Sequence, residues 1–261
     1  MEFRILEHKA GGSSSNAERA AILLLTLGEA GPEGMALREL AVSLGEAKPA
    51  VHRTLVAMMR HGFVEQRQGR GSYRLGPAIY ALSRRENSAG ELVRQWRPVL
   101  IGLGQRLGCT TFLIVRAGLD AVVLDMHVGP MPIQLMSTGV GGRLPLGAGP
   151  GASAILSVQD EATREQVLST NHDRYPTSGV TPELARRMVN EAVVRGYSRS
   201  LGDIHPGSGG VGVPIIGRDG SCNAAITASL ADPALSAEYL ERLALAIKEA
   251  MASAGWSGVR P

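Results

Sequence analysis

The N-terminal part of the chain places hydrophobic residues at intervals that predict three short helices. Apolar residues at helical spacing follow Ser15, which forms an S-x-x-E capping box with Glu18. A second apolar stripe covers residues 37–44 and ends at Gly45, a residue type typical of helix C-caps. The third helix begins beside Pro49, because proline is tolerated in the first turn of a helix.

A hairpin pattern follows the third helix. Residues 61–66 and 72–75 are predicted as strands joined by a glycine-containing turn. Within the third helix, Val51, Leu55 and Met58 recur at the spacing of a buried stripe. Two helices joined by a tight turn and followed by a hairpin are typical of a winged helix-turn-helix, which is a DNA-binding fold.

The rest of the chain contains hydrophobic patterns of both helices and strands, which predicts an α+β domain. Helical patterns cover residues 77–85, 89–107, 151–158, 161–169, 182–195 and 236–254, and strand patterns cover residues 110–116, 121–127, 133–137, 210–216 and 222–229. Consecutive strands joined by short turns indicate a mainly antiparallel sheet with flanking helices. We therefore expect a flexible tail at 1–14, a winged helix-turn-helix domain at 15–76, a linker helix at 77–87 and a larger domain at 88–261.

Composition narrows the class of protein. A hydrophobic fraction of 44% is ordinary for a globular protein, and an aromatic fraction of 4% argues against stacking platforms for single-stranded nucleic acid. Cys109 and Cys222 stand far apart, so neither a disulfide framework nor a structural zinc site is expected. The sequence has no leader pattern and no apolar run of about 18 residues. We expect a cytoplasmic protein without metal, cofactor or membrane contact.

The positive charge is concentrated in one segment. Between Lys48 and Arg74 six basic residues stand against Glu65 alone, which gives a local charge of +5. Binding to duplex DNA needs a local basic surface of this kind rather than a high positive net charge of the whole chain. The alternative is that these side chains form an ordinary solvated surface.

The predicted DNA contacts lie on the outer face of the third helix and in the wing. Arg53 is suited to donate two hydrogen bonds to guanine, and the wing arginines are suited to phosphate or the minor groove. His52 is a weaker candidate, because a surface histidine without a role explains it equally well. The candidate DNA-binding residues are Arg38, Lys48, Pro49, His52, Arg53, Arg67 and Arg70.

Two other patterns suggest different functions. Gly207, Gly209 and Gly212 spell G-x-G-x-x-G, but a dinucleotide site needs a helix after this motif and a strand is predicted here. The alternative function is a metal-dependent or acid/base enzyme that uses His127, Asp203 and His205, with the N-terminal domain as an interaction module. Because the sequence has no G-x-S-x-G or H-E-x-x-H motif, we predict no catalytic residue and no metal ligand.

Six fragments of the sequence, in this order and spacing, resemble those of a known protein family. They are Lys48–Leu55, His61–Glu65, Tyr73–Gly76, Gly142–Leu146, Arg195–Tyr197 and Ala224–Ser229. In these fragments and their spacing the sequence resembles the IclR (isocitrate lyase regulator) family of bacterial transcription factors. The resemblance implies a GAF-like effector-binding domain at 88–261, a homodimer or dimer of dimers, and binding to a palindromic double-stranded DNA operator. The expected function is a repressor controlled by a small organic acid or aromatic effector.

The resemblance also implies the position of the effector site, against the sheet of the larger domain. It places contacts at Met136, Leu144, Pro150, Gly151, Ala152, Ser200, Gly210, Thr227 and Ser229. Two physical arguments agree with this position. Residues 149–153 open a helix whose free N–H groups attract a carboxylate, and Thr227 and Ser229 face the same side of one strand. The alternative is that this side of the strand faces solvent.

The sequence departs from the family pattern around this site. Residues 147–153 lack the histidine and the Gly-Lys pair that are usual there, and Gly210 replaces a common cysteine. Of the acidic residues usual after the Gly-Tyr pair, only Asp203 is retained nearby. Because these changes remove side chains, we expect a bulkier effector than a two- or three-carbon acid, such as an aromatic acid.

Overall fold

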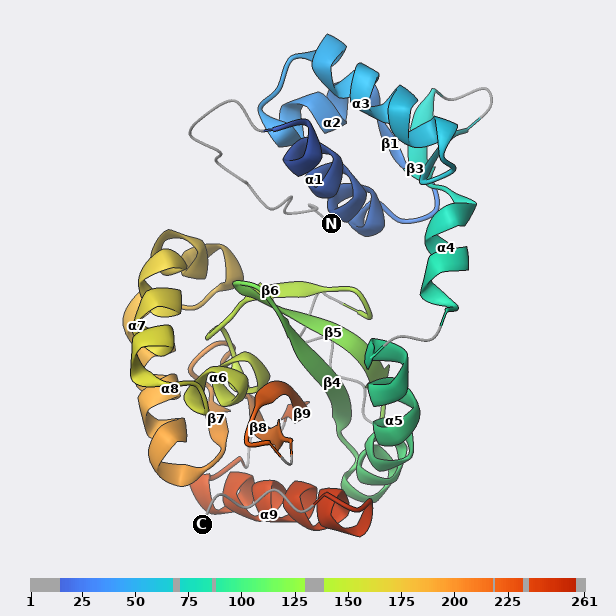
Figure 1. Ribbon diagram of the computed structural model, residues 1–261. Coiled ribbons are helices and arrows are strands. Elements are labelled where there is room, and N and C mark those ends of the chain that lie inside the picture. Colours follow the sequence, from blue (N-terminus) through green and yellow to red (C-terminus); the bar gives the residue numbers. More distant parts are fainter. Residues whose placement is uncertain are drawn as a thin grey trace. The chain divides into compact units, whose positions relative to one another are not determined.

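The structure is a computed structural model that describes residues 15–67, 71–85, 88–129, 139–217, 219–231 and 235–256. The chain forms two compact units, residues 1–87 and 88–261 (Figure 1). The predicted tail at 1–14, the predicted strand at 133–137, and the candidate residues Arg70 and Met136 lie outside the described residues.

The N-terminal unit combines helices with a small antiparallel sheet. Its helices are α1 (Asn16–Glu29), α2 (Leu37–Leu44), α3 (Lys48–Arg60) and α4 (Pro77–Ser83), and its strands are β1 (Met35–Ala36), β2 (Val64–Gln66) and β3 (Ser72–Leu75). The sheet order is β1-β3-β2. Leu23, Leu40, Val51 and Leu55 are fully buried at the centre of its core. The predicted winged helix-turn-helix is confirmed.

Two details of this unit differ from the prediction. Strand β1 was not predicted, because a two-residue strand has no detectable periodicity. The strand predicted at 61–66 begins only at Val64, since the amides of His61 and Gly62 still donate to carbonyls of the last turn of α3. Gly62 ends that helix with a φ of +71°, which a glycine adopts without steric cost.

The C-terminal unit is built on a six-stranded antiparallel sheet. Its strands are β4 (Thr110–Ala117), β5 (Asp120–His127), β6 (Arg143–Pro145), β7 (Ser198–Leu201), β8 (Ser208–Ile216) and β9 (Cys222–Ala231). Its helices are α5 (Ser88–Leu107), α6 (Pro150–Ser157), α7 (Glu161–Thr170), α8 (Pro182–Arg195), α9 (Ala237–Ser253) and the 3-10 helix η1 (His172–Ser178). The strand order is β6-β5-β4-β9-β8-β7, with every neighbouring pair antiparallel.

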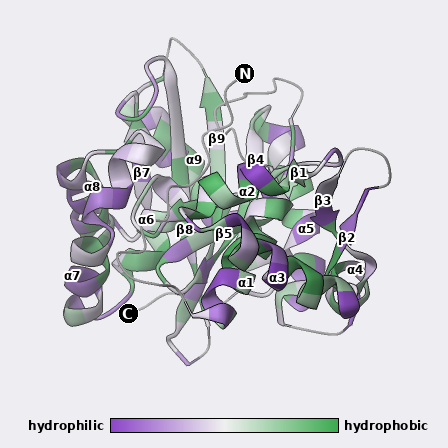
Figure 2. Cartoon of the chain, turned by 90° about the horizontal axis from the view of Figure 1, so that it is seen from above, coloured by the Kyte–Doolittle hydropathy of each residue, from purple (hydrophilic) through white to green (hydrophobic). Residues whose placement is uncertain are grey.

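Helices cover both faces of this sheet and form two hydrophobic cores. Helices α5 and α9 pack on one face, whereas α6 lies against the other with α8 and α7 outside it (Figure 1). Hydrophilic stretches mark α7 and α8, while α6 and the strands are more hydrophobic (Figure 2). The α+β class with an antiparallel sheet is confirmed. Strands β6 and β7 and the helix η1 were not predicted, because each is short and interrupted by polar residues, glycine or proline.

Candidate DNA-binding surface and effector site

The turn between α2 and α3 is fixed by local backbone geometry. Gly45 adopts a left-handed φ of 63°, and its amide donates to the carbonyls of Ala41 and Val42 at the end of α2. This is the αL termination that the sequence predicts at Gly45. Helix α3 then begins two residues after Glu46, with Pro49 in its first turn.

An ion pair ties this turn to α1. Nη2 of Arg19 lies 2.9 Å from Oε1 of Glu46, and Nη1 of Arg19 donates to Oδ1 of Asn16 at 2.8 Å. The Arg19 side chain is 8% exposed. A buried guanidinium needs such partners, because an uncompensated charge in the interior is costly. The sequence analysis missed this pair, whose members are 27 positions apart.

Helix α3 separates its apolar and polar residues cleanly. Val51 and Leu55 are 0% exposed and face the core, whereas Lys48, Pro49, His52 and Arg53 are all exposed. No ion pair engages Lys48 or Arg53 within the ranges that the structure describes. Arg38 of α2 is exposed as well. The first turns of α3 therefore present uncompensated positive charge to solvent.

The wing arginines are placed differently from those of α3. Arg67 forms an ion pair with Glu33, and Arg74 lies 2.5 Å from Glu65 on the neighbouring strand. These two guanidinium groups already have carboxylate partners, so their contribution to a positive surface is smaller than a count of basic residues suggests. The amide of Arg67 donates to the carbonyl of Ser72 at 2.8 Å, which closes the described part of the hairpin.

The start of α6 lies directly on the sheet because three glycines allow it. A Cβ atom at Gly151 would fall 2.3 Å from Oγ1 of Thr227, and one at Gly212 would fall 2.3 Å from the carbonyl oxygen of Pro150. A Cβ atom at Gly210 would fall 3.4 Å from Cγ of Pro150 and 3.0 Å from Oγ of Ser229. In the first turn of α6, Pro150 has no N–H group, and those of Gly151 and Ala152 have no acceptor within the helix. Free N–H groups at a helix start suit an anionic ligand.

Hydroxyl groups line the face of the sheet that carries α6. Ser200, Gly210, Ser229 and Thr110 lie side by side across β7, β8, β9 and β4. Residues directly opposite each other on neighbouring strands share a face. A parallel row consists of Ser198, Gly212, Thr227 and Phe112. The structure thus brings together the predicted residues Ser200, Gly210, Thr227 and Ser229.

Three of these hydroxyls have no hydrogen-bond partner in the part of the chain that the structure describes. They belong to Thr110, Ser198 and Thr227, and all three are buried. An unpaired buried hydroxyl costs about 1–3 kcal/mol, so a bound water or ligand is the ordinary explanation. The sequence analysis missed Thr110 and Ser198. The i, i+2 relation between Ser198 and Ser200 was the available signal.

Apolar side chains stand beside the hydroxyl rows. Met126, Leu144 and Ile204 are partly buried and pack against the core that contains α6. Met126 lies opposite Phe112 and so extends one row, and Cδ1 of Ile204 lies 3.9 Å from where a Cβ of Gly149 would be, close to the start of α6. The predicted contact Leu144 lies opposite Ala121, toward the other end of β5, so the register does not place it beside the rows. Hydroxyls, amides and apolar groups in one place suit a small ligand with polar edges and an apolar face.

The residues considered for an alternative enzyme function do not form a site. His127 packs against Gly104 of α5 on one face of the sheet, whereas Asp203 pairs with Arg187 of α8 at 3.1 Å on the other. Among the described residues, no group of three His, Cys, Asp or Glu side chains could hold a metal ion. Burial raises the pKa of Cys109 to about 11, so this thiol stays protonated and is a poor nucleophile. The G-x-G-x-x-G segment leads into β8 and not into a helix.

Comparisons with known proteins agree for both units. Residues 17–68 match the IclR helix-turn-helix domain, and residues 87–254 match the family described as bacterial transcriptional regulator IclR C-terminal. The chain is 25% identical over 218 residues to the HTH-type transcriptional regulator KipR of Bacillus subtilis, which is 83% of this chain and 86% of that protein. It is 31% identical over 140 residues to the acetate operon repressor of Salmonella typhimurium, which is 53% of this chain and 50% of that protein.

The fold is shared with solved structures. An IclR homologue from Microbacterium hydrocarbonoxydans, crystallised in complex with 4-hydroxybenzoate, has a TM-score of 0.70 and 24% identity, and the match covers 92% of this chain and 100% of that one. The matching families and relatives are regulators of transcription and not enzymes. Every helix within the described ranges is too short or too polar to cross a membrane.

Proposed function

Because the chain belongs to the IclR family of bacterial transcriptional regulators, which bind DNA, we propose that it is a repressor whose operator binding is controlled by a small organic carboxylate. The observation that carries the DNA-binding part is the outer face of α3. Lys48 and Arg53 are exposed there and form no ion pair among the described residues, while the opposite face is fully buried. A recognition helix needs this arrangement, because its N-terminal side chains must reach base edges while its other face packs on the domain.

The proposed DNA contacts are the residues that the sequence predicts. Arg53 contacts guanine, Lys48 and His52 reach bases or phosphates, and Arg67 reaches phosphate by exchanging its partner Glu33 for DNA. We propose a homodimer or a dimer of dimers, because paired half-sites need paired recognition helices. Arg38, Pro49 and Arg70 complete the proposed surface.

A gel-shift experiment with the promoter DNA beside the protein's own gene tests this proposal. Arg53→Ala is expected to weaken specific binding about 10- to 100-fold, the discrimination of a bidentate arginine–guanine contact. Arg60→Ala is the matched control, since Arg60 is exposed at the other end of α3 and the charge change is the same. An equal loss of DNA affinity in the two variants would show that Arg53 contributes only nonspecific electrostatic attraction and would overturn its proposed contact with guanine. Unchanged DNA binding by Arg53→Ala would refute the assigned surface.

The proposed effector site joins the first turn of α6 to the hydroxyl rows and the apolar groups. We propose that the carboxylate of the effector binds the N–H groups of Gly151 and Ala152 beside Pro150, and that its ring packs on apolar side chains such as Leu144. The other predicted apolar contact, Met136, lies outside the described residues. Ser200, Thr227 and Ser229 donate hydrogen bonds to the effector's other polar groups, while Gly210 leaves room. The absence of a usual histidine and cysteine supports an aromatic acid over a two- or three-carbon acid. The hydroxyls of Thr110, Ser198 and Thr227, which have no partner among the described residues, support a ligand with several polar groups.

Titration calorimetry tests the class of effector. We use 4-hydroxybenzoate as the aromatic probe, because a protein of the same fold forms a complex with it, and glyoxylate and pyruvate as the small acids. We expect binding of the aromatic acid and release of promoter DNA in the gel shift. Tight binding of glyoxylate or pyruvate without binding of the aromatic acid would overturn the proposed class.

A further inference from the structure

The 3-10 helix η1 holds the short loop that leads into α6. This loop, residues 146–149, is called the α6 loop below. Oη of Tyr175 donates to the carbonyl of Leu146 at 2.9 Å, and Nδ2 of Asn171 donates to the same carbonyl at 3.3 Å and to that of Leu119 at 2.8 Å. Asn171 and Tyr175 are both fully buried. Two side chains that lie far from the loop in sequence therefore converge on one of its carbonyls.

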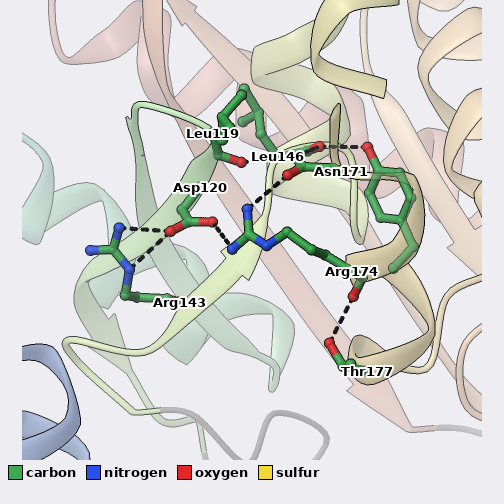
Figure 3. Close-up of polar contacts among 8 residues, drawn as sticks. Leu119, Asp120, Arg143, Leu146, Asn171, Arg174 and Thr177 are labelled. Atoms are coloured by element: carbon green, nitrogen blue, oxygen red, sulfur yellow. Dashed lines mark hydrogen bonds and ion pairs between the residues drawn. The ribbon is translucent and has the colours of Figure 1, made fainter. Parts of the chain in front are cut away.

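A charged cluster orients the Asn171 amide. Nη1 of Arg174 donates to Oδ1 of Asn171 at 2.7 Å, which turns the NH2 group of that amide toward the backbone carbonyls. Arg174 also donates to Oδ1 of Asp120 at 2.5 Å, and Arg143 of β6 donates to Oδ2 of the same carboxylate at 2.7 Å (Figure 3). One buried carboxylate thus joins β5, β6 and η1 immediately before the α6 loop begins.

The α6 loop passes through two positive-φ glycines, and its carbonyl groups are held by side-chain hydrogen bonds. Gly147 and Gly149 have φ values of +102° and +84°, and Oγ of Ser153 donates to the carbonyl of Gly147 at 2.8 Å. A Cβ atom at Gly147 would lie 2.8 Å from Oη of Tyr175, so the tyrosine packs directly on the loop. Two successive carbonyls are engaged on the side of η1 and α6, which fixes the peptide planes that precede the first turn of α6.

We propose that Asn171 and Tyr175 are positioning residues of the effector site. They hold the α6 loop in the conformation that presents the first-turn N–H groups of α6 to the ligand. The inference rests on the proposed function for the identity of that ligand, whereas the control of the loop stands on the hydrogen bonds alone. Burial raises the pKa of Tyr175 to about 12, so its hydroxyl remains a donor throughout the neutral range.

Hydrogen exchange of the full-length chain tests the control of the loop without any ligand. Tyr175→Phe removes only the hydroxyl, and we expect amide exchange in a peptide covering residues 146–153 to become about 2- to 10-fold faster, the effect of one lost hydrogen bond. Peptides from α9 are expected to keep their rates. Unchanged exchange in residues 146–153, or an equal acceleration in α9, would overturn the proposal.

Thr177→Val is the matched control. It also removes one hydroxyl from η1. Oγ1 of Thr177 donates to the carbonyl of Arg174 at 2.7 Å and forms no hydrogen bond with the α6 loop among the described residues. We expect exchange in residues 146–153 to stay at the wild-type rate. If Thr177→Val reproduces the effect of Tyr175→Phe, the role of η1 is general stability and the positioning role is refuted.

Titration calorimetry with 4-hydroxybenzoate is the second part of the test of the positioning role. Tyr175→Phe is expected to weaken its binding about 2- to 10-fold relative to both the wild type and Thr177→Val. Faster exchange in Tyr175→Phe with unaltered affinity would refute the link between the loop and the effector. Failure of the wild type to bind the probe would instead count against the proposed effector class, and the exchange experiment would still decide whether η1 controls the loop.

Discussion

The outer face of α3 and the α6 face of the sheet both present polar groups, but they do so in opposite ways. On α3 the polar groups are charged and exposed, and they stand above a fully buried apolar stripe. On the sheet they are neutral hydroxyls, and several are buried without a partner among the described residues. Exposed charges act over a distance set by salt, whereas buried hydroxyls act only in direct contact. The two surfaces therefore suit a long polyanion and a small enclosed ligand, respectively.

The close approach of α6 to the sheet gives the largest expected effect. Gly212→Ala places a methyl group 2.3 Å from the carbonyl oxygen of Pro150. We expect the free energy of unfolding of the C-terminal unit to fall by about 1–3 kcal/mol through overpacking. Trp96 and Trp256 are the two tryptophans of the chain, and both belong to this unit. Their fluorescence during urea unfolding measures the change.

The control for this substitution is another glycine of the same unit. A Cβ atom at Gly102 in α5 meets no neighbouring atom within 4 Å, so Gly102→Ala is expected to be neutral or stabilising by up to about 1 kcal/mol. A fall in stability for Gly102→Ala as large as that for Gly212→Ala would mean that close approach to α6 is not what makes Gly212 necessary.

The second prediction concerns the charge on α3. Lys48→Ala is expected to reduce the slope of log K for DNA binding against log salt concentration by about one, since one phosphate contact is lost. Over the same salt range, binding of 4-hydroxybenzoate is expected to change far less, because its partners are neutral. Fluorescence anisotropy with labelled promoter DNA and calorimetry provide the two measurements. A steep salt dependence of effector binding would remove the contrast between the surfaces.

The smallest effect is expected from a buried hydroxyl. The hydroxyl of Thr227 has no partner within the described ranges, and Thr227→Val replaces it with a methyl group of similar size. The free energy of unfolding is therefore expected to stay the same or to rise by up to about 1 kcal/mol. Binding of 4-hydroxybenzoate is expected to weaken at the same time, because a ligand contact is lost. Thermal unfolding and calorimetry measure the two quantities. A loss of stability would indicate that the hydroxyl serves the fold and not the ligand.

The features that the sequence predicted are those encoded by neighbouring residues. Helix α2 has the predicted bounds, and Gly45 ends it as predicted, because apolar spacing and a glycine C-cap are local signals. The buried stripe of α3 was predicted in the same way, from the spacing of its apolar residues. The exposed positions of Lys48 and Arg53 then follow from helix geometry, although their contacts with DNA stay predictions.

The features that escaped the sequence analysis depend on residues far apart in the chain. Thr110 joins Ser229 only through the register between β4 and β9, which no short stretch encodes. Asn171 reaches the carbonyl of Leu119, which is 52 positions away. Strands β6 and β7 are sheet edges, and their polar, short sequences form strands only because β5 and β8 provide a partner.

The Arg19–Glu46 ion pair has a consequence for engineering of the protein. Because α1 is tied to the turn before α3, a graft that imports a foreign recognition helix together with its turn would leave Arg19 facing a mismatched partner in the interior. Two routes keep the pair intact: exchange of the whole block from α1 to α3, or redesign of the exposed α3 positions alone. The second route leaves the scaffold untouched, so Lys48, His52 and Arg53 are the positions at which a library of altered operator specificities is best built.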